Sequence, residues 1–430
     1  MILAYLDPGS GSALVGTLIA VAGAGLYSLK SFFYRLVRKP TPEEVEAARN
    51  ANPDIAIFSE GKNYWGTFKA TAEELISRKI HFAYYTLDLY DPALLIDNEY
   101  MHSHLFDKNK AASFQKLAKI KAKVLLATTP NIGTPGYPLV RPAGVEKMVH
   151  VFHAFADISA YHVGSLDNYD IVLTVGPHQE KPIREVEKSR SLHAKQLIST
   201  GLPYFDAQYH ALQFSSSTCP TCSSAADSSD VALAEAEALA KEATRLKTIL
   251  IAPSWGAKGL LSEYGTDFIV RLAEAGFNVI VRPHPQSYIA EADLLSRCKA
   301  ETAKFTSIVW DSETVGTKSM LASDILISDT SSIRFDYAFL YEKPVITLDI
   351  PHERQLEYEG QFMSEIWTDS AAKRLGRIIG HEELGDIVSI VKDVLESGAA
   401  EGVRKFRDET ITNLGRSAVA VVDELKSLAV

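Results

Sequence analysis

ILISDTSSIRFDYAFL, at residues 325–340, is the stretch of sequence that decides the fold. Ile325–Ile327 form a short apolar run rich in β-branched side chains, which is typical of a buried parallel strand. Residues 333–340 have apolar side chains at helical spacing, and the loop 341–344 ends that helix. The hydroxyl-rich segment in between therefore lies at the carboxyl end of a strand and the amino end of a helix.

This strand-to-helix junction has a chemistry that suits an anion. Free backbone N–H groups and the positive end of the helix dipole favour a phosphate there. The side chains add hydroxyls and one carboxylate, which could orient a sugar or an alditol. Ordinary helix capping by Ser, Thr and Asp is the alternative explanation. The residues of this junction are Ser328, Asp329, Thr330, Ser331 and Ser332.

A second strand end carries Arg282-Pro283-His284-Pro285, directly after the apolar run 277–281. The prolines make this loop stiff, and it presents a permanent cation and a titratable imidazole. Arginine can bind phosphate bidentately, and histidine can donate to a phosphoryl oxygen. The alternative is a loop whose prolines only end the strand. Ligands of open α/β sheets bind at strand ends of this kind, which favours the phosphate clamp.

The rest of the chain alternates strand-like and helical stretches, which indicates parallel sheets covered on both faces. A segment rich in Ser, Thr, Ala and Cys near residues 214–230 interrupts the pattern, which then restarts. We therefore expect two Rossmann-like halves that face a cleft. The expected strands are 54–59, 81–85, 123–127, 149–152, 170–175 and 196–198, and then 248–252, 279–281, 307–310, 325–327 and 345–348.

Composition narrows the class of protein. The chain has 430 residues, of which 46% are hydrophobic, enough for two domains and additional segments. A net charge of −10 without long basic runs argues against a general nucleic-acid binder. Three cysteines exclude a disulfide framework and fit a reducing compartment. Cys219 and Cys222 have the spacing of half a zinc or redox motif, but their Ser-rich surroundings favour a surface insertion.

The amino end predicts a membrane anchor. Residues 13–29 form an uncharged apolar run, at the short end of the ~17–25 residues that span a bilayer. Cations and aromatics follow it within residues 30–39, which is typical of the cytoplasmic interface. A cleaved signal peptide would have its cations before the apolar run. An interfacial helix that enters one leaflet, or a buried core helix, is the alternative.

His153 is the candidate for acid–base chemistry in the first half of the chain. It follows the expected strand 149–152 and precedes a loop, so it can face the same cleft as Arg282 and His284. A base on one domain and a phosphate clamp on the other would suit transfer between two bound substrates. The alternative is a histidine packed at a strand end. His178 is a weaker candidate that we expect in a turn.

Residues 327–337, with Lys343–Ile346 behind them, resemble the signature of the CDP-glycerol:poly(glycerophosphate) glycerophosphotransferases. The upstream motifs APSW, residues 252–255, and RPHP, residues 282–285, stand in the order that this family shows. The resemblance is strong from about residue 250 to 350 and weaker from about 123 to 206. It implies a GT-B fold, a peripheral membrane location, and transfer of glycerol phosphate from CDP-glycerol to an acceptor hydroxyl.

The resemblance also implies roles for single residues. His153 would be the catalytic base, and His284 would contact the donor phosphate. Two departures from the family pattern stand out: Ala154 follows the base where better-known members have Gly, and Gly256 follows Trp255 where Arg is usual. The donor-binding residues expected from the junctions and motifs together are Ser254, Arg282, Ser328, Asp329, Thr330, Ser331 and Ser332.

We therefore expect a membrane-associated enzyme that moves an alditol phosphate from a CDP-alditol to a lipid-linked glycan or polymer and releases CMP, as in teichoic acid biosynthesis. No metal or other cofactor and no nucleic acid is expected. The alternatives are a GT-B glycosyltransferase that uses a nucleotide sugar and a non-catalytic membrane scaffold. The expected domains are an anchor at 1–39, an acceptor domain at 40–211, an insert at 212–246 and a donor domain at 247–430, on the cytoplasmic side of the cell membrane.

Overall fold

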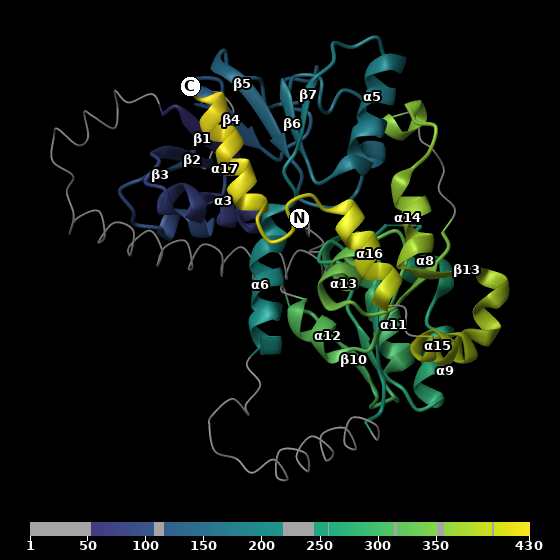
Figure 1. The fold of residues 1–430 in the computed structure, drawn as a ribbon. Coiled ribbons are helices and arrows are strands. Elements are labelled where there is room, and N and C mark those ends of the chain that lie inside the picture. The colour runs from purple at the N-terminus through teal and green to yellow at the C-terminus, as the bar shows by residue number, and fades with distance from the viewer. Residues whose placement is uncertain are drawn as a thin grey trace, which may run out of the picture.

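Two α/β domains, one above the other in Figure 1, make up the computed structural model. It describes residues 53–106, 116–217, 245–256, 258–313, 316–350, 357–397 and 400–430. Within these ranges no helix has the length and apolar character needed to cross a bilayer. The predicted anchor at 1–39 and the cysteine pair Cys219 and Cys222 lie outside the described residues.

The first domain is built on a seven-stranded sheet in which every neighbouring pair is parallel, in the order β3-β2-β1-β4-β5-β6-β7. The inner strand β1 is fully buried, as expected for a parallel strand covered on both faces. The strands are β1 Ile55–Ser59, β2 Phe82–Thr86, β3 Met101–Leu105, β4 Lys121–Ala127, β5 Gly144–Val151, β6 Ile171–Thr174 and β7 Gln196–Ser199. The helices are α3 Trp65–Ser77, α5 Glu180–Ser189 and α6 Pro203–Ser217, with 3-10 turns η1 Lys62–Tyr64, η2 Pro92–Leu95, η3 Ile158–Ala160 and η4 Pro177–Gln179.

The second domain repeats this plan with a six-stranded parallel sheet in the order β10-β9-β8-β11-β12-β13. The strands are β8 Thr248–Ala252, β9 Asn278–Val281, β10 Ile308–Trp310, β11 Ile325–Ser328, β12 Val345–Leu348 and β13 Gly376–Ile379. The helices are α8 Leu260–Tyr264, α9 Asp267–Glu274, α10 Ser287–Ala290, α11 Ala292–Thr302, α12 Thr317–Ala322, α13 Ile333–Tyr341, α14 Trp367–Leu375, α15 Ile387–Glu396 and α16 Ala400–Thr410. The 3-10 turns are η5 Glu359–Phe362 and η6 His381–Asp386. The predicted α/β fold with two Rossmann-like domains is confirmed.

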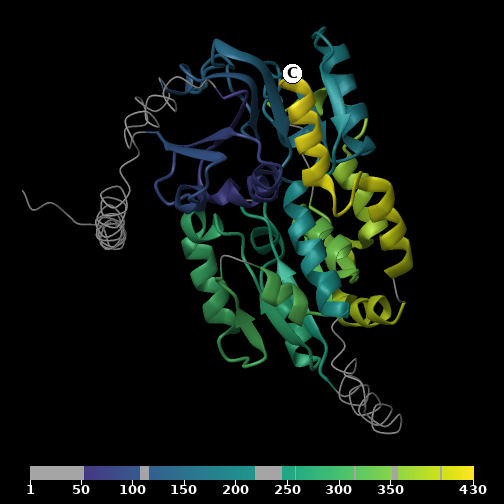
Figure 2. The same ribbon diagram turned by 60° about the vertical axis from the view of Figure 1, so that its left-hand side comes forward.

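The carboxyl-terminal helix α17, Ser417–Leu428, leaves the second domain and packs on the first. Its buried residues Val421, Val422 and Leu425 share a core cluster with α3 and the first sheet. The yellow helix lies on the upper domain in both Figure 1 and the turned view of Figure 2. The chain therefore crosses between the domains twice.

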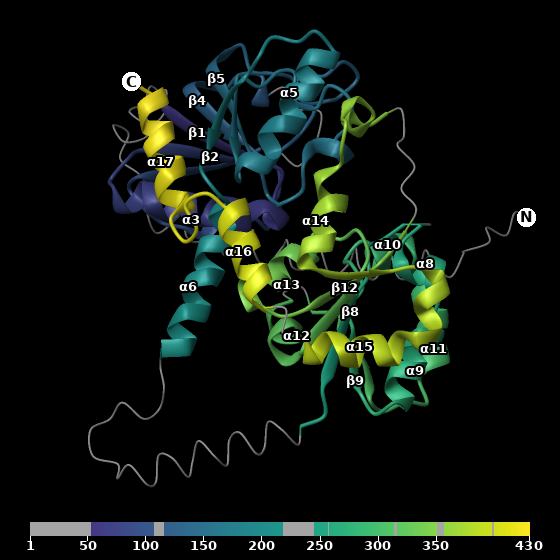
Figure 3. The same cartoon turned by 45° about the vertical axis from the view of Figure 1, so that its right-hand side comes forward.

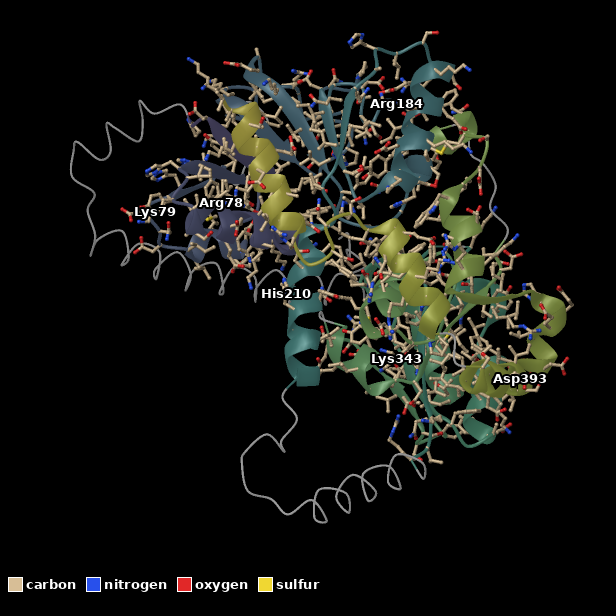
Figure 4. All side chains as sticks on the ribbon, viewed as in Figure 1. Arg78, Lys79, Arg184, His210, Lys343 and Asp393 are labelled. Atoms are coloured by element: carbon tan, nitrogen blue, oxygen red, sulfur yellow. The ribbon has the colours of Figure 1, made fainter. Side chains whose placement is uncertain are left out.

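Helix α6 makes the first crossing and contacts α3, α13 and α17. His210 on this helix lies between the two domains in Figure 4, and its Nε2 is 2.8 Å from the carbonyl oxygen of Gly415, just before α17. One hydrophobic core then runs through both domains, since Phe58 and Phe155 belong to the same buried cluster as Phe335. The two sheets are thus fixed by shared apolar packing as well as by the two crossings.

Candidate active site

The first half of the site lies at the carboxyl edge of the first sheet. Ala127 is paired with both Phe58 and His150, so the loops that follow β1, β4 and β5 leave the sheet at the same level. His153 is in the loop after β5, where its Nδ1 lies 3.0 Å from Oγ1 of Thr128 in the loop after β4. A parallel sheet thereby brings together side chains from loops far apart in the sequence.

The surroundings of His153 favour an uncharged imidazole. Burial lowers the pKa of His153, because the imidazolium would lose its hydration. The ring of Tyr64 packs edge-on against it, with a centroid distance of 5.5 Å. With the proton on Nδ1, donated to the Thr128 hydroxyl, Nε2 keeps the lone pair that a general base requires. The geometry is compatible with the predicted role of His153, which stays a prediction.

Tyr64, which contacts this base, belongs to a group of tyrosines that the sequence analysis did not single out. Burial and then the charge of Glu60 raise the pKa of Tyr64, and the same two causes raise that of Tyr137 to about 12. Both phenols are therefore protonated at neutral pH and can donate hydrogen bonds. In the same group, the Tyr161 hydroxyl lies 3.4 Å from Nε2 of the fully buried His150. Tyrosines spread along the chain gave no pattern that could have predicted this cluster.

His178 is not part of this cluster. As predicted, it lies in a turn, η4, where its Nε2 is 2.9 Å from the carbonyl oxygen of Phe155 and its ring packs 4.0 Å from that of Trp367. Burial lowers its pKa to about 4. This histidine therefore joins the two domains as a neutral packing residue.

The second half of the site is organised by the buried carboxylate of Asp329. This side chain is 0% exposed and accepts hydrogen bonds from the backbone N–H of Ser254 at 3.0 Å, of Leu260 at 2.9 Å and of Ser331 at 3.1 Å. The Ser254 hydroxyl donates to it at 2.6 Å. Asp329 therefore holds the loop after β8 against the junction after β11. These contacts show that Asp329 supports the loops around it. That these loops bind the donor stays a prediction.

The remaining junction residues divide into supports and accessible groups. Ser328 is fully buried, and its hydroxyl donates to the carbonyl oxygen of Ala252 at 2.5 Å. Thr330, Ser331 and Ser332 are half-buried at the start of α13. The Ser332 side chain makes no capping hydrogen bond, although this residue precedes the helix. Simple capping therefore does not account for the Ser332 hydroxyl, which stays available for a ligand.

The RPHP loop places its two polar side chains differently. Arg282 is paired with Asp311, with an N–O distance of 2.7 Å, and both side chains are largely buried. This ion pair fixes the loop, whereas a direct contact of Arg282 with a donor phosphate stays a prediction. His284 is exposed, and its ring stacks on that of Trp255 with a centroid distance of 6.4 Å. Partial burial lowers the pKa of His284, against the opposing charges of Asp329 and Glu291.

A cavity of about 680 Å³ opens at the same carboxyl edge, between the start of α13, the end of β12 and α14. Apolar side chains form part of its wall, and Arg334 was not identified from the sequence as a ligand-binding residue. Its position among apolar helix residues gave no signal of this kind. The polar residues that line the cavity are Thr330, Arg334, Thr347, Asp349, Asp369 and Lys373.

Aromatic packing brings the two halves together. Phe155 comes two residues after His153, and its ring lies 6.1 Å from that of Phe335 and 5.3 Å from that of Phe339. Both partners are on α13, which starts directly after Ser332. In Figure 3 this helix lies at the upper side of the second domain, facing the first. The loop of the candidate base and the junction of the candidate donor site are therefore fixed to each other.

Residues 162–353 match the CDP-glycerol:poly(glycerophosphate) glycerophosphotransferase family. The matched segment includes the RPHP loop, Asp329 and the start of α13. The predicted resemblance is confirmed over these residues. The match also confirms the prediction of a glycerophosphotransferase-like transferase, at the level of the family. No curated protein sequence matches the chain.

Solved structures share the fold at low sequence identity. The wall teichoic acid polymerase TagF is similar with a TM-score of 0.54 and 14% identity, over 95% of this chain and 98% of that chain. The UDP-GlcNAc 2-epimerase from Neisseria meningitidis has a TM-score of 0.52 and 14% identity, over 87% and 99%. A putative 2-epimerase from Listeria monocytogenes has a TM-score of 0.55 and 10% identity, over 88% and 96%. These similarities confirm the GT-B-type two-domain architecture.

Proposed function

We propose that this glycerophosphotransferase-like protein transfers glycerol phosphate, or another alditol phosphate, from a CDP-alditol to an acceptor hydroxyl and releases CMP. The observation that carries the proposal is the packing of Phe155 on α13, which fixes the loop of His153 to the helix that starts directly after Ser332. The family match over residues 162–353 supports the donor class. The TagF structure, obtained with CDPG, has the same fold.

On the donor side, the diphosphate would lie at the start of α13. The backbone N–H groups and the dipole of this helix favour an anion, and the Ser331 and Ser332 hydroxyls add donors. His284 would donate to a phosphoryl oxygen from the facing loop. Arg282 and Asp329 would act through the positions that they give to these groups. Such transfer depends mainly on positioning and charge stabilisation.

On the acceptor side, His153 would take the proton of the attacking hydroxyl on Nε2. The hydroxyl oxygen forms a bond to the β-phosphorus of the donor, and the bond from this phosphorus to the oxygen that bridges to CMP breaks. CMP leaves with the electron pair of that bond. The lowered pKa of His153 keeps the base unprotonated at neutral pH.

We also propose that the acceptor is a lipid-linked glycan or polymer and that the protein works at the cytoplasmic face of the cell membrane. This rests on the apolar run at residues 13–29 and the cations that follow it. A membrane-bound enzyme would meet a lipid-linked acceptor in two dimensions, with its catalytic domains in the cytoplasm.

The test is CMP release from CDP-glycerol and CDP-ribitol by the full chain, with a membrane extract as the source of acceptor. We expect release from one donor and a loss of about 10²–10⁴-fold in His153→Ala, the usual contribution of a general base. His193→Ala is the matched control, because His193 is exposed in the turn before β7, at the opposite edge of the sheet. Full activity of His153→Ala would refute the role of this residue. CMP release from neither donor, or turnover of UDP-GlcNAc instead, would refute the proposed donor class.

A further inference from the structure

Arg334 is an exception among the buried arginines of this structure. Its side chain is 2% exposed, and its guanidinium has two neutral partners, the carbonyl oxygen of Ser331 at 3.1 Å and the Thr347 hydroxyl at 3.2 Å. It forms no ion pair with a carboxylate in the described part of the chain. The other arginines with little exposure, Arg282, Arg190 and Arg407, each pair with at least one carboxylate within 3.0 Å.

A buried charge without a counter-ion is unfavourable, and proteins normally pair it. Burial lowers the pKa of Arg334 to about 10, against the opposing charges of Asp329 and Asp369, so the side chain is still a cation at neutral pH. Among the described residues the charges of these two carboxylates act on Arg334, but neither carboxylate forms an ion pair with it. A guanidinium without such a contact at the wall of a cavity therefore points to an anionic ligand that completes its environment. The cavity beside Arg334 measures about 680 Å³, within the range of ~300–1,000 Å³ that small-molecule sites occupy.

The charges of the cavity lining indicate which kind of anion can bind there. Arg334 and Lys373 supply two positive charges, and Asp349 and Asp369 supply two negative charges. The two cations would attract a ligand that carries only negative groups, and the two carboxylates would repel it to about the same extent. A ligand with one phosphate and several hydroxyl or amino groups fits better, because the carboxylates can accept hydrogen bonds from those groups. A nucleoside monophosphate has this combination.

We propose that Arg334 binds the phosphate of the CMP half of the donor in this cavity, with the nucleoside hydroxyl or amino groups against Asp349 and Asp369. This rests on the proposed function, which supplies the CDP-alditol. The location is consistent with the reaction, since Arg334 Nε donates to the carbonyl oxygen of Ser331, one of the residues proposed to hold the diphosphate. Arg334 thus connects the nucleotide cavity to the start of α13.

The test compares CMP with cytidine, the same ligand without phosphate, by isothermal titration calorimetry on the full chain. We expect CMP to bind the wild type more tightly than cytidine. Loss of a charge-assisted contact in Arg334→Met should weaken CMP by about 10- to 100-fold and leave cytidine unchanged. Arg377→Gln is the matched control, because Arg377 lies on β13 between two cavity residues, Gly376 and Ile378, but is itself exposed and paired with Glu383.

An unchanged ratio of CMP to cytidine affinity in Arg334→Met overturns the inference, and so does a wild type that binds neither ligand. If Arg334→Met fails to fold by circular dichroism, Arg334→Lys decides: it keeps the charge but loses the planar fork, so CMP affinity should fall about tenfold. CMP affinity equal to the wild type in that variant overturns the proposal. CMP release measured separately distinguishes failure of this inference from failure of the proposed transfer.

Discussion

Replacing Asp329 by alanine tests the link between the buried carboxylate and donor binding. The change removes the acceptor of three backbone N–H groups, those of Ser254, Leu260 and Ser331. The Leu260 bond is buried, whereas water can reach the other two, which are partly buried. Substitution should therefore both destabilise the second domain and release the two loops that Asp329 holds together.

The expected magnitude follows from these contacts. An unpaired buried donor costs about 1–3 kcal/mol, and the partly exposed ones cost less, so we expect a loss of about 3–5 kcal/mol in the free energy of unfolding. Donor binding must then order the Ser254 and Ser331 side chains again. At about 0.5–1.5 kcal/mol each, this weakens the donor Kd by roughly 5- to 150-fold.

Urea unfolding and calorimetric titration with CDP-glycerol measure the two effects. Asp324→Ala is the matched control. Asp324 accepts a hydrogen bond from the Thr248 backbone N–H at 2.7 Å, at the amino ends of β8 and β11. It should lose stability but keep its donor Kd. An Asp329→Ala protein with wild-type stability would refute the reasoning, as would a loss of donor affinity of the same size in Asp324→Ala.

Two further predictions concern the packing around the base. Burial, and then the charge of His153, lowers the pKa of His150 to about 3, so the folded protein binds one proton fewer than the unfolded chain between about pH 6 and 4. The free energy of unfolding should therefore fall as the pH decreases below about 6.5. In urea titrations, His150→Gln should reduce the slope of this free energy against pH by up to ~1.4 kcal/mol per pH unit. An unchanged slope would contradict a buried neutral His150. Phe155→Ala should cost about 3–5 kcal/mol of stability and also lower kcat/KM, since the fully buried ring joins the His153 loop to α13. Phe268→Ala, in the separate core of the second domain, should match the first effect only, and equal kcat/KM in the two variants would argue against coupling through Phe155.

Most strands that the sequence predicted contain buried apolar residues, whereas β7, which was also predicted, has none. β1, β8 and β11 are fully buried and lie where the apolar pattern indicated. The strands not predicted are β3 and β13, at one edge of each sheet. β3 alternates buried Met101 with polar residues, and β13 starts at Gly376 directly after α14. A Cβ at residue 376 would collide with the carbonyl oxygen of Val345, so the packing requires glycine there although glycine is a weak strand former.

The position of α17 could not be predicted from the sequence either. Its apolar spacing indicates a helix with one buried face, but not which surface covers that face. The structure places Val421 and Leu425 against the first domain, about 300 residues along the chain from β4. Helix periodicity is local information, whereas the choice of partner depends on where the chain has already folded.

The sequence by itself determined that strand-to-helix junctions carry the chemistry, because alternating strands and helices force a parallel sheet whose loops meet at one edge. It thus placed His153, His284 and Ser331 at strand ends. Only the tertiary structure decided what each charged side chain faces. Arg282 pairs with Asp311, whereas Arg334 lines a cavity and forms no ion pair with any carboxylate that the structure describes. The physical reason is that burial and pairing are set by contacts between residues distant in sequence, which local periodicity does not encode.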